Sequence, residues 1–86
     1  MKFNKIKIYG IATDEIMDNV FGFCYVNKLI ANYTEDDMGC QLDEADIEIL
    51  EGIEGINFEG DEITLIANTY DRLTLKKGQY RTIEIF

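Results

Sequence analysis

Apolar and polar residues alternate strictly near the start of the chain. Between Lys5 and Tyr9, the apolar residues Ile6 and Ile8 are separated by Lys7. A period of two residues is typical of a strand that has one face buried and one face in water. The pattern therefore predicts a β-strand over residues 5–9.

The pattern changes after residue 12, where a helix is predicted near residues 13–20. Thr13 is a preferred N-cap residue type, and two acidic residues follow it, as is common in a first helical turn. The next apolar residues share one helical face: Ile16, Met17 and Val20. Residues 21–31 fit either a longer helix or a hairpin. Gly22 and the β-preferring residues around it favour a short helix followed by a hairpin.

A near-repeat adds to the evidence for hairpins. The hexamer at residues 29–34 (LIANYT) recurs at residues 65–70 (LIANTY), and each copy follows a turn-forming pair and an earlier apolar run. The pairs are Asn27-Lys28, directly before the first copy, and Gly60-Asp61, a few residues before the second. Asn and Gly tolerate the positive φ that two-residue turns require. We therefore expect one hairpin around each pair.

Residues 42–51 are interpreted as an acidic amphipathic helix. At helical spacing, one face is apolar and consists of Leu42, Ala45, Ile49 and Leu50. The opposite side carries the carboxylates of Asp43, Glu44, Glu48 and Glu51. Gly52 or Gly55 would end the helix.

The chain is expected to end in a third hairpin, with strands over residues 72–75 and 80–86 and a turn at 76–79. No Pro- or Ser-rich linker divides the 86 residues. The sequence therefore predicts a single α+β domain over residues 1–86, made mainly of antiparallel hairpins with one acidic helix and one short helix.

Composition argues against catalysis. The chain has no His, which removes the commonest general base near neutral pH, and no Ser. Cys24 and Cys40 would have no imidazole to activate them as nucleophiles. Two cysteines are too few for a disulfide scaffold, and no apolar run is long enough for a signal peptide or a membrane span. We therefore expect a cytoplasmic protein that is not an enzyme.

Metal and cofactor sites are not predicted. The acidic run at residues 35–37 precedes Gly39, but aligning Gly39 with the glycine of an EF-hand loop places Thr34, Met38 and Ala45 at three ligand positions. No Cys/His cluster for zinc and no Gly-rich phosphate loop is present. The net charge of −9 also opposes direct binding to nucleic acid.

Charge is segregated along the chain. No basic residue lies between Lys28 and Arg72, and that stretch holds 13 of the 17 carboxylates. One explanation is solubility alone. The other is a partner with a positively charged groove, which an acidic surface would enter much as a nucleic acid does.

Small size, strong acidity and missing catalytic groups resemble the phage- and plasmid-encoded inhibitors that mimic nucleic acid, including anti-CRISPR and anti-restriction proteins. The resemblance is one of composition and implies a basic, nucleic-acid-binding partner, such as a nuclease or effector complex, in the host cytoplasm. The hypothesis assigns partner binding to seven carboxylates: Glu35, Asp36, Asp37, Asp43, Glu44, Glu48 and Glu51. The alternatives are an assembly module that pairs through an exposed sheet edge, and an acidic immunity protein or antitoxin. We expect the protein to be either a monomer or a homodimer.

Overall fold

The computed structural model describes residues 5–33, 44–67 and 70–86, without the side chains of Tyr33 and Glu44. One helix and seven strands lie in these residues, and the fold class is α+β, as predicted. In chain order they are β1 (Ile6–Ala12), α1 (Thr13–Val26), β2 (Ala31–Tyr33), β3 (Glu44–Ile49), β4 (Ile53–Glu59), β5 (Glu62–Ala67), β6 (Arg72–Leu75) and β7 (Thr82–Ile85).

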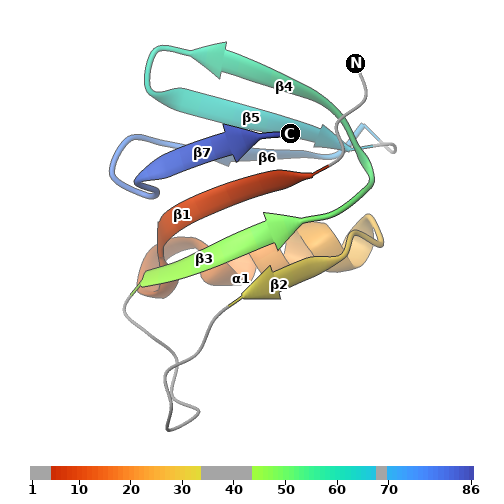
Figure 1. Cartoon of the computed structure of the whole chain (residues 1–86), viewed down its shortest axis with the longest axis horizontal. Helices are drawn as coiled ribbons and strands as arrows, with labels where there is room; N and C mark the ends of the chain where they lie inside the picture. Colours follow the sequence, from red (N-terminus) through yellow and green to blue (C-terminus); the bar gives the residue numbers. More distant parts are fainter. Residues whose placement is uncertain (1–4, 34–43, 68–69) are drawn as a thin grey trace, which may run out of the picture.

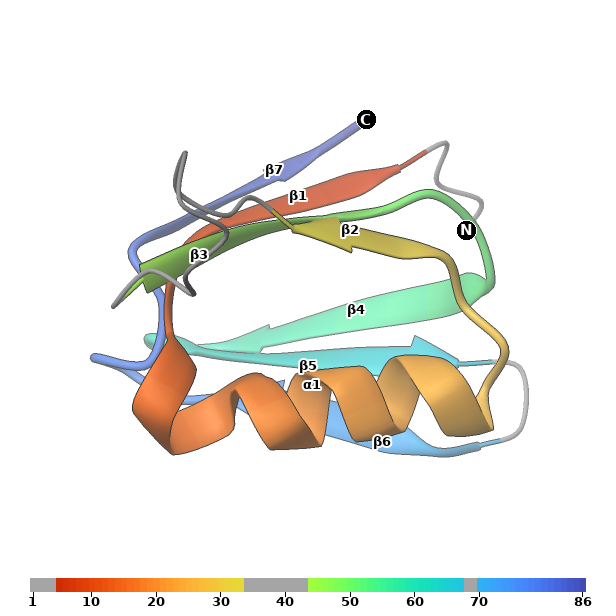
Figure 2. The ribbon, with the colours of Figure 1, turned by 90° about the horizontal axis from the view of Figure 1, so that it is seen from below.

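The elements form two layers (Figure 1, Figure 2). The first layer is a four-stranded sheet in the order β2-β3-β1-β7, and the second contains a three-stranded sheet in the order β4-β5-β6. Figure 2 shows the layers edge-on, with α1 beside the three-stranded sheet and beneath the four-stranded one. All strand pairs are antiparallel. The apolar core is enclosed between the layers.

Strand β1 is the centre of the four-stranded sheet because it pairs with both β3 and β7. Its inward side chains Ile6 and Ile8 are completely buried, and their partners on β3 are Ile49 and Ile47. Lys7 points outward between Glu48 of β3 and Glu84 of β7. The strand predicted from the alternation at residues 5–9 is therefore confirmed.

A bulge interrupts β1 at Gly10. The register with β3 shifts by one residue between Ile8 and Ile11, and Gly10 has φ +69°. The Gly10 N–H donates to Oδ1 of Asp46 at 3.1 Å. A Cβ at this position would lie 2.7 Å from the Cβ of Arg81. Glycine is required here by both conformation and space.

The prediction of a short helix near residues 13–20 was wrong, because α1 continues beyond residue 20 to Val26. Its buried residues keep a helical period to the end: Ile16, Met17, Val20, Phe23 and Cys24. Packing of this face outweighs the helix cost of Gly22, which lies on the exposed side. The N-cap is Ala12, not Thr13, which is the first helical residue.

The turn expected at Asn27-Lys28 exists, but it ends the helix instead of joining two strands. Leu29 N–H donates to the Cys24 carbonyl at 2.8 Å, and Lys28 N–H donates to the Tyr25 carbonyl at 3.2 Å. Lys28 adopts φ +58°. This is a Schellman motif, which explains why a residue sequence typical of a turn appeared here.

The acidic helix predicted at residues 42–51 was also wrong where the structure describes it, because residues 44–49 form β3 in the middle of the sheet. Ala45, Ile47 and Ile49 are each 1% exposed, whereas Leu50, predicted to face the core, is 37% exposed. The segment alternates with period two as well as fitting a helical stripe. Pairing with β1 and β2 on both sides decides in favour of the strand.

The other two hairpin predictions had different outcomes. The hairpin around Gly60-Asp61 is confirmed, since it joins β4 to β5. The C-terminal hairpin was wrong, although both of its strands form. Strand β6 pairs with β5, whereas β7 crosses to the other layer and pairs with β1. Ala12 N–H donates to the Gln79 carbonyl and Arg81 N–H to the Tyr9 carbonyl, which hold the crossing chain against β1.

Candidate functional site

Of the seven predicted partner-binding carboxylates, the three that the structure describes do not lie on a helix. Glu35, Asp36, Asp37 and Asp43 lie outside the described residues. Glu44 begins β3, Glu48 lies on the same strand, and Glu51 is exposed in the connection from β3 to β4. The structure places these last three along the path from the first layer to the second.

Glu48 belongs to a surface of mixed charge. Its Oε1 atom lies 3.2 Å from Nζ of Lys5, and Lys7 is its direct partner on β1. Lys5 and Lys7 also lie over the ring of Phe86, at 4.9 and 5.9 Å from its centroid. The outward face of the four-stranded sheet therefore compensates much of its own charge.

A concentration of acidic side chains without basic neighbours in sequence is found on α1. Asp14, Glu15 and Asp18 are exposed on this helix, which contains no Lys or Arg. Among the described residues, none of the three takes part in a salt bridge. Asp14 and Asp18 are four positions apart, so their Cβ atoms stand about 6 Å from each other on one side of the helix. We call these three residues the acidic helix face.

An open groove of about 510 Å³ adjoins the acidic helix face, between α1 and β6. Asp18 belongs to both features. The apolar part of the groove consists of Phe23, Val26 and Leu73. The polar lining also includes Asn19, Asn27, Asp71, Arg72 and Thr74.

The groove and helix face together can accommodate a long basic side chain. The methylene groups of a Lys or Arg residue can lie on Phe23 and Val26, while the charged end reaches Asp18. Gly22 leaves the helix side of the groove open, because no atom lies within 4 Å of where its Cβ would be.

Sequence reasoning missed this site. Asp14 and Glu15 were interpreted only as favourable first-turn acids, and Asp18 was assigned no role. The available signal was the absence of any basic residue from residues 8–27, although most of the acids are in the middle of the chain. The groove itself could not be found, because it requires α1 to lie beside a strand that is distant in sequence.

Two titratable groups in the described part of the chain have a shifted pKa, and neither forms a catalytic arrangement. Burial raises the pKa of the Cys24 thiol to about 11, so the thiol is protonated near neutral pH. A hydrogen bond to Glu84 raises the pKa of Tyr9, with smaller contributions from desolvation and from nearby acids. Both groups therefore remain neutral at physiological pH.

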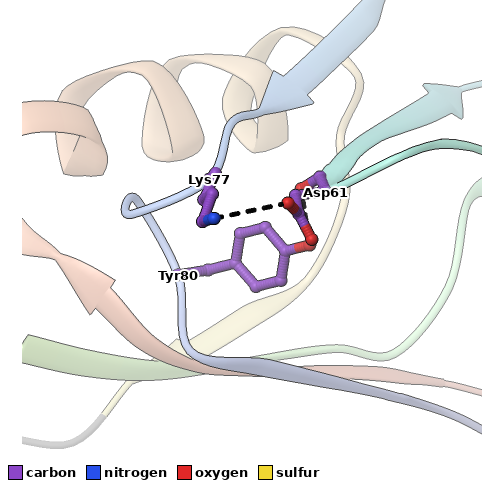
Figure 3. Close-up of polar contacts among 3 residues, drawn as sticks. All are labelled: Asp61, Lys77 and Tyr80. Carbon is purple, nitrogen blue, oxygen red and sulfur yellow. Dashed lines mark hydrogen bonds and ion pairs between the residues drawn. The ribbon is translucent and has the colours of Figure 1, made fainter.

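A polar contact links the two layers at one end (Figure 3). The Tyr80 hydroxyl donates to the main-chain carbonyl of Asp61 at 2.9 Å, and Lys77 Nζ lies 3.7 Å from Oδ2 of Asp61. Lys77 and Tyr80 come from the connection between β6 and β7, and Asp61 from the β4–β5 turn. This contact ties the β4–β5 hairpin to the base of β7.

Among the described residues, no three or more His, Cys, Asp or Glu side chains are placed so that they could hold a metal ion together. In the same part of the chain, no helix is long and apolar enough to cross a membrane. Comparison with known proteins found no matching family model, no similar curated protein and no similar solved structure. Function must therefore be argued from the surface of this chain.

Proposed function

We propose that this protein is a non-enzymatic inhibitor that binds a basic, nucleic-acid-handling protein of the host cytoplasm by presenting an acidic surface in place of nucleic acid. Inhibitors of this kind, of the anti-CRISPR or anti-restriction type, are encoded by phages and mobile elements. The observation that carries the proposal is the acidic helix face, with Asp14, Glu15 and Asp18 exposed on a helix that has no basic residue.

Electrostatics supports this proposal in three ways. Like charges at Asp14 and Asp18 cost the isolated helix a few tenths of a kcal/mol, a cost that a cationic partner would reverse. A positively charged groove would also release its counterions on binding the helix, as it does on binding a nucleic acid. The net charge of −9 would speed the encounter.

Affinity capture at increasing ionic strength tests the proposal. The immobilised protein is exposed to a cell lysate at low salt, and bound proteins are eluted with rising NaCl and identified by mass spectrometry. We expect basic nucleic-acid-binding proteins that elute as salt rises and are displaced by soluble DNA or RNA. Retention that resists both salt and nucleic acid would contradict the proposal.

A matched pair of variants locates the binding surface. Asp14→Asn, Glu15→Gln and Asp18→Asn together remove three charges from the acidic helix face. The control, Glu54→Gln, Glu59→Gln and Glu62→Gln, removes three charges from the β4–β5 hairpin. We expect the first variant to lose the captured proteins and the control to retain them. Equal losses would show that net charge alone, and not this face, governs binding.

A further inference from the structure

The open side of the two layers, opposite α1, exposes side chains that belong to the core-facing set. Phe58 on β4 is 59% exposed, although its cross-strand partner Ile63 is 1% exposed. Ile85 on β7 is 39% exposed, although its partner Ile6 is 1% exposed. Phe58 and Ile85 therefore face the interior side of their sheets at a place where the opposite layer does not cover them.

The arrangement of the layers explains this exposure. In Figure 1, β4 lies at the top of the view, above β7, and no strand of the four-stranded sheet is drawn in front of it. Both strands are edges of their sheets, since β4 pairs only with β5 and β7 only with β1 among the described strands. One additional strand beside β7 would cover the inner side of β4, where Ile56 and Phe58 lie.

The free edge of β7 has its main-chain groups in place for such a strand. Phe86 N–H donates to the Lys5 carbonyl at 3.0 Å. Antiparallel partners alternate between hydrogen-bonded and non-bonded pairs, so the pair Ile6–Ile85 and the pair Ile8–Ile83 are not bonded to each other. The N–H and C=O groups of Ile83 and Ile85 therefore point away from β1. Their side chains point toward the core.

We propose that β7 receives one β-strand of a partner protein, which completes the first layer and covers β4. The apolar side chains of the incoming strand pack on Ile83 and Ile85 beside them and on Ile56 and Phe58 across the layers. Its main chain pairs with the edge of β7. This mode of recognition takes affinity from main-chain hydrogen bonds and specificity from alternate side chains.

Charge identifies the occupant as a basic amphipathic strand, in which Lys or Arg alternates with apolar residues. Strand β7 carries Glu84 and no basic residue, and Lys7 of β1 pairs with Glu84 on the side away from the free edge. Glu84 lies on the outward face of β7, where alternate residues of the incoming strand would stand beside it. Opposite charges on neighbouring strands are favourable, and like charges are not.

A second copy of this chain is a poor occupant. Two chains with a net charge of −9 repel each other. Twofold pairing of two β7 edges would also bring the two overhanging β4 strands into the same space (Figure 1). A second copy is therefore disfavoured on both electrostatic and steric grounds, and an acidic strand of another protein on electrostatic grounds alone.

Binding of short peptides to the full chain tests the proposal. The probe is a blocked peptide of alternating Val and Lys, and the matched control replaces each Lys with Glu. Titration calorimetry is expected to show at least tenfold weaker binding of the Glu peptide. NMR is expected to show shift changes at residues 82–85, 56 and 58, with slower hydrogen exchange at the Ile83 and Ile85 amides.

Two variants separate this edge from the rest of the surface. Ile85→Pro removes an N–H that faces the free edge and takes no part in the β1 ladder, and Phe58→Asp places a charge on the exposed inner side of β4. Each variant is expected to bind the Val-Lys peptide at least tenfold more weakly than the native protein does. Should Ile85→Pro fail to fold, Phe58→Asp decides the question alone.

Several results would overturn the proposal: no binding of the Val-Lys peptide, undiminished binding by folded variants, shift changes confined to α1, or a dimer that Ile85→Pro abolishes. The variant with a neutralised acidic helix face should bind the peptide as the native protein does, apart from a small effect of net charge. The two proposals can therefore fail separately.

Discussion

The side chains of Lys5 and Glu48 meet on the outward face of the four-stranded sheet, with Nζ and Oε1 3.2 Å apart. The two residues come from different charge regions of the sequence, Lys5 from the basic N-terminal flank and Glu48 from the acidic middle. Pairing of β1 with β3 brings them together. Folding therefore compensates part of the charge segregation, and the excess negative charge is left on other surfaces, including α1.

The Lys5–Glu48 pair is expected to contribute little to stability. Both side chains are about a third exposed, at 35% and 33%. Solvent screening and side-chain entropy keep such pairs near 0.2–1 kcal/mol, which here means a coupling of about 0.5 kcal/mol that decreases at high salt. A double-mutant cycle of Lys5→Ala and Glu48→Ala, followed by urea unfolding at two salt concentrations, measures it. A coupling above about 2 kcal/mol would contradict this prediction.

Substitutions at Ile47 and Leu50 distinguish the strand from the helix that the sequence favoured. Ile47 is 1% exposed and Leu50 is 37% exposed. We expect Ile47→Ala to cost about 2–5 kcal/mol and Ile47→Val about 0.5–1.5 kcal/mol, whereas Leu50→Ala should cost about 1 kcal/mol or less. Chemical unfolding measures all three. The reverse order would support a helix with Leu50 on its buried face.

The two glycines at positions 10 and 22 should respond to alanine in opposite directions. Gly10→Ala is expected to destabilise the protein by at least about 1–2 kcal/mol, because φ is +69° and the new Cβ would overlap the Cβ of Arg81. Gly22→Ala should stabilise it by about 0.5–1 kcal/mol, because the position is helical and nothing lies nearby. Thermal unfolding of the two variants provides the comparison. Equal effects would show that the bulge or the helix is misassigned.

Tyr9 should titrate above the ordinary range of a tyrosine. Its pKa is raised chiefly by the hydrogen bond to Glu84. A pKa that is higher in the folded than in the unfolded state contributes stability below the unfolded value of about 10, and this contribution is lost as pH rises through the folded pKa. We expect Glu84→Gln to lower the Tyr9 pKa toward its ordinary value. NMR titration of the Tyr9 ring carbon in the native protein and in the variant measures the shift.

Cys24 should react slowly with thiol reagents while the protein is folded. The side chain is 4% exposed, and burial raises the pKa of its thiol to about 11. In a Cys40→Ala background, alkylation by iodoacetamide near pH 8 should follow global unfolding and accelerate in urea. Rapid alkylation of the folded protein would show that α1 opens locally around Cys24.

Where the hydrophobic pattern fitted only one period, the secondary structure could be predicted from the sequence. Ile6 and Ile8 alternate with lysines that cannot be buried, so the pattern predicts a strand and no helix. The structure confirms this prediction, since both residues lie in β1. Gly60-Asp61 lies between two β-preferring runs, and it forms the expected hairpin turn. Thr13 and its two acids predicted where α1 begins to within one residue. In each case, local sterics and local hydrogen bonding determine the outcome.

Where a segment fitted both a helical and a strand period, tertiary structure decided which of the two formed. Residues 44–49 fit both a helical stripe and an alternating strand, and the strand forms because β1 and β2 are available on its two sides. Residues 21–26 carry β-preferring side chains but remain helical, because Phe23 and Cys24 extend the buried face of α1. Burial against distant elements supplies more free energy than the propensity differences it overrides.

The sequence by itself thus determined the fold class, most strand positions and the size of the negative charge. Only tertiary structure decided which charges remain unpaired, where the groove beside α1 lies, and that β7 pairs with β1 instead of β6. The described strands of the four-stranded sheet therefore leave the inner side of β4 uncovered. The physical reason is that strand partners and layer order depend on contacts between residues far apart in the chain. A hydrophobic pattern specifies which side of an element is buried, but it does not specify which element will cover it.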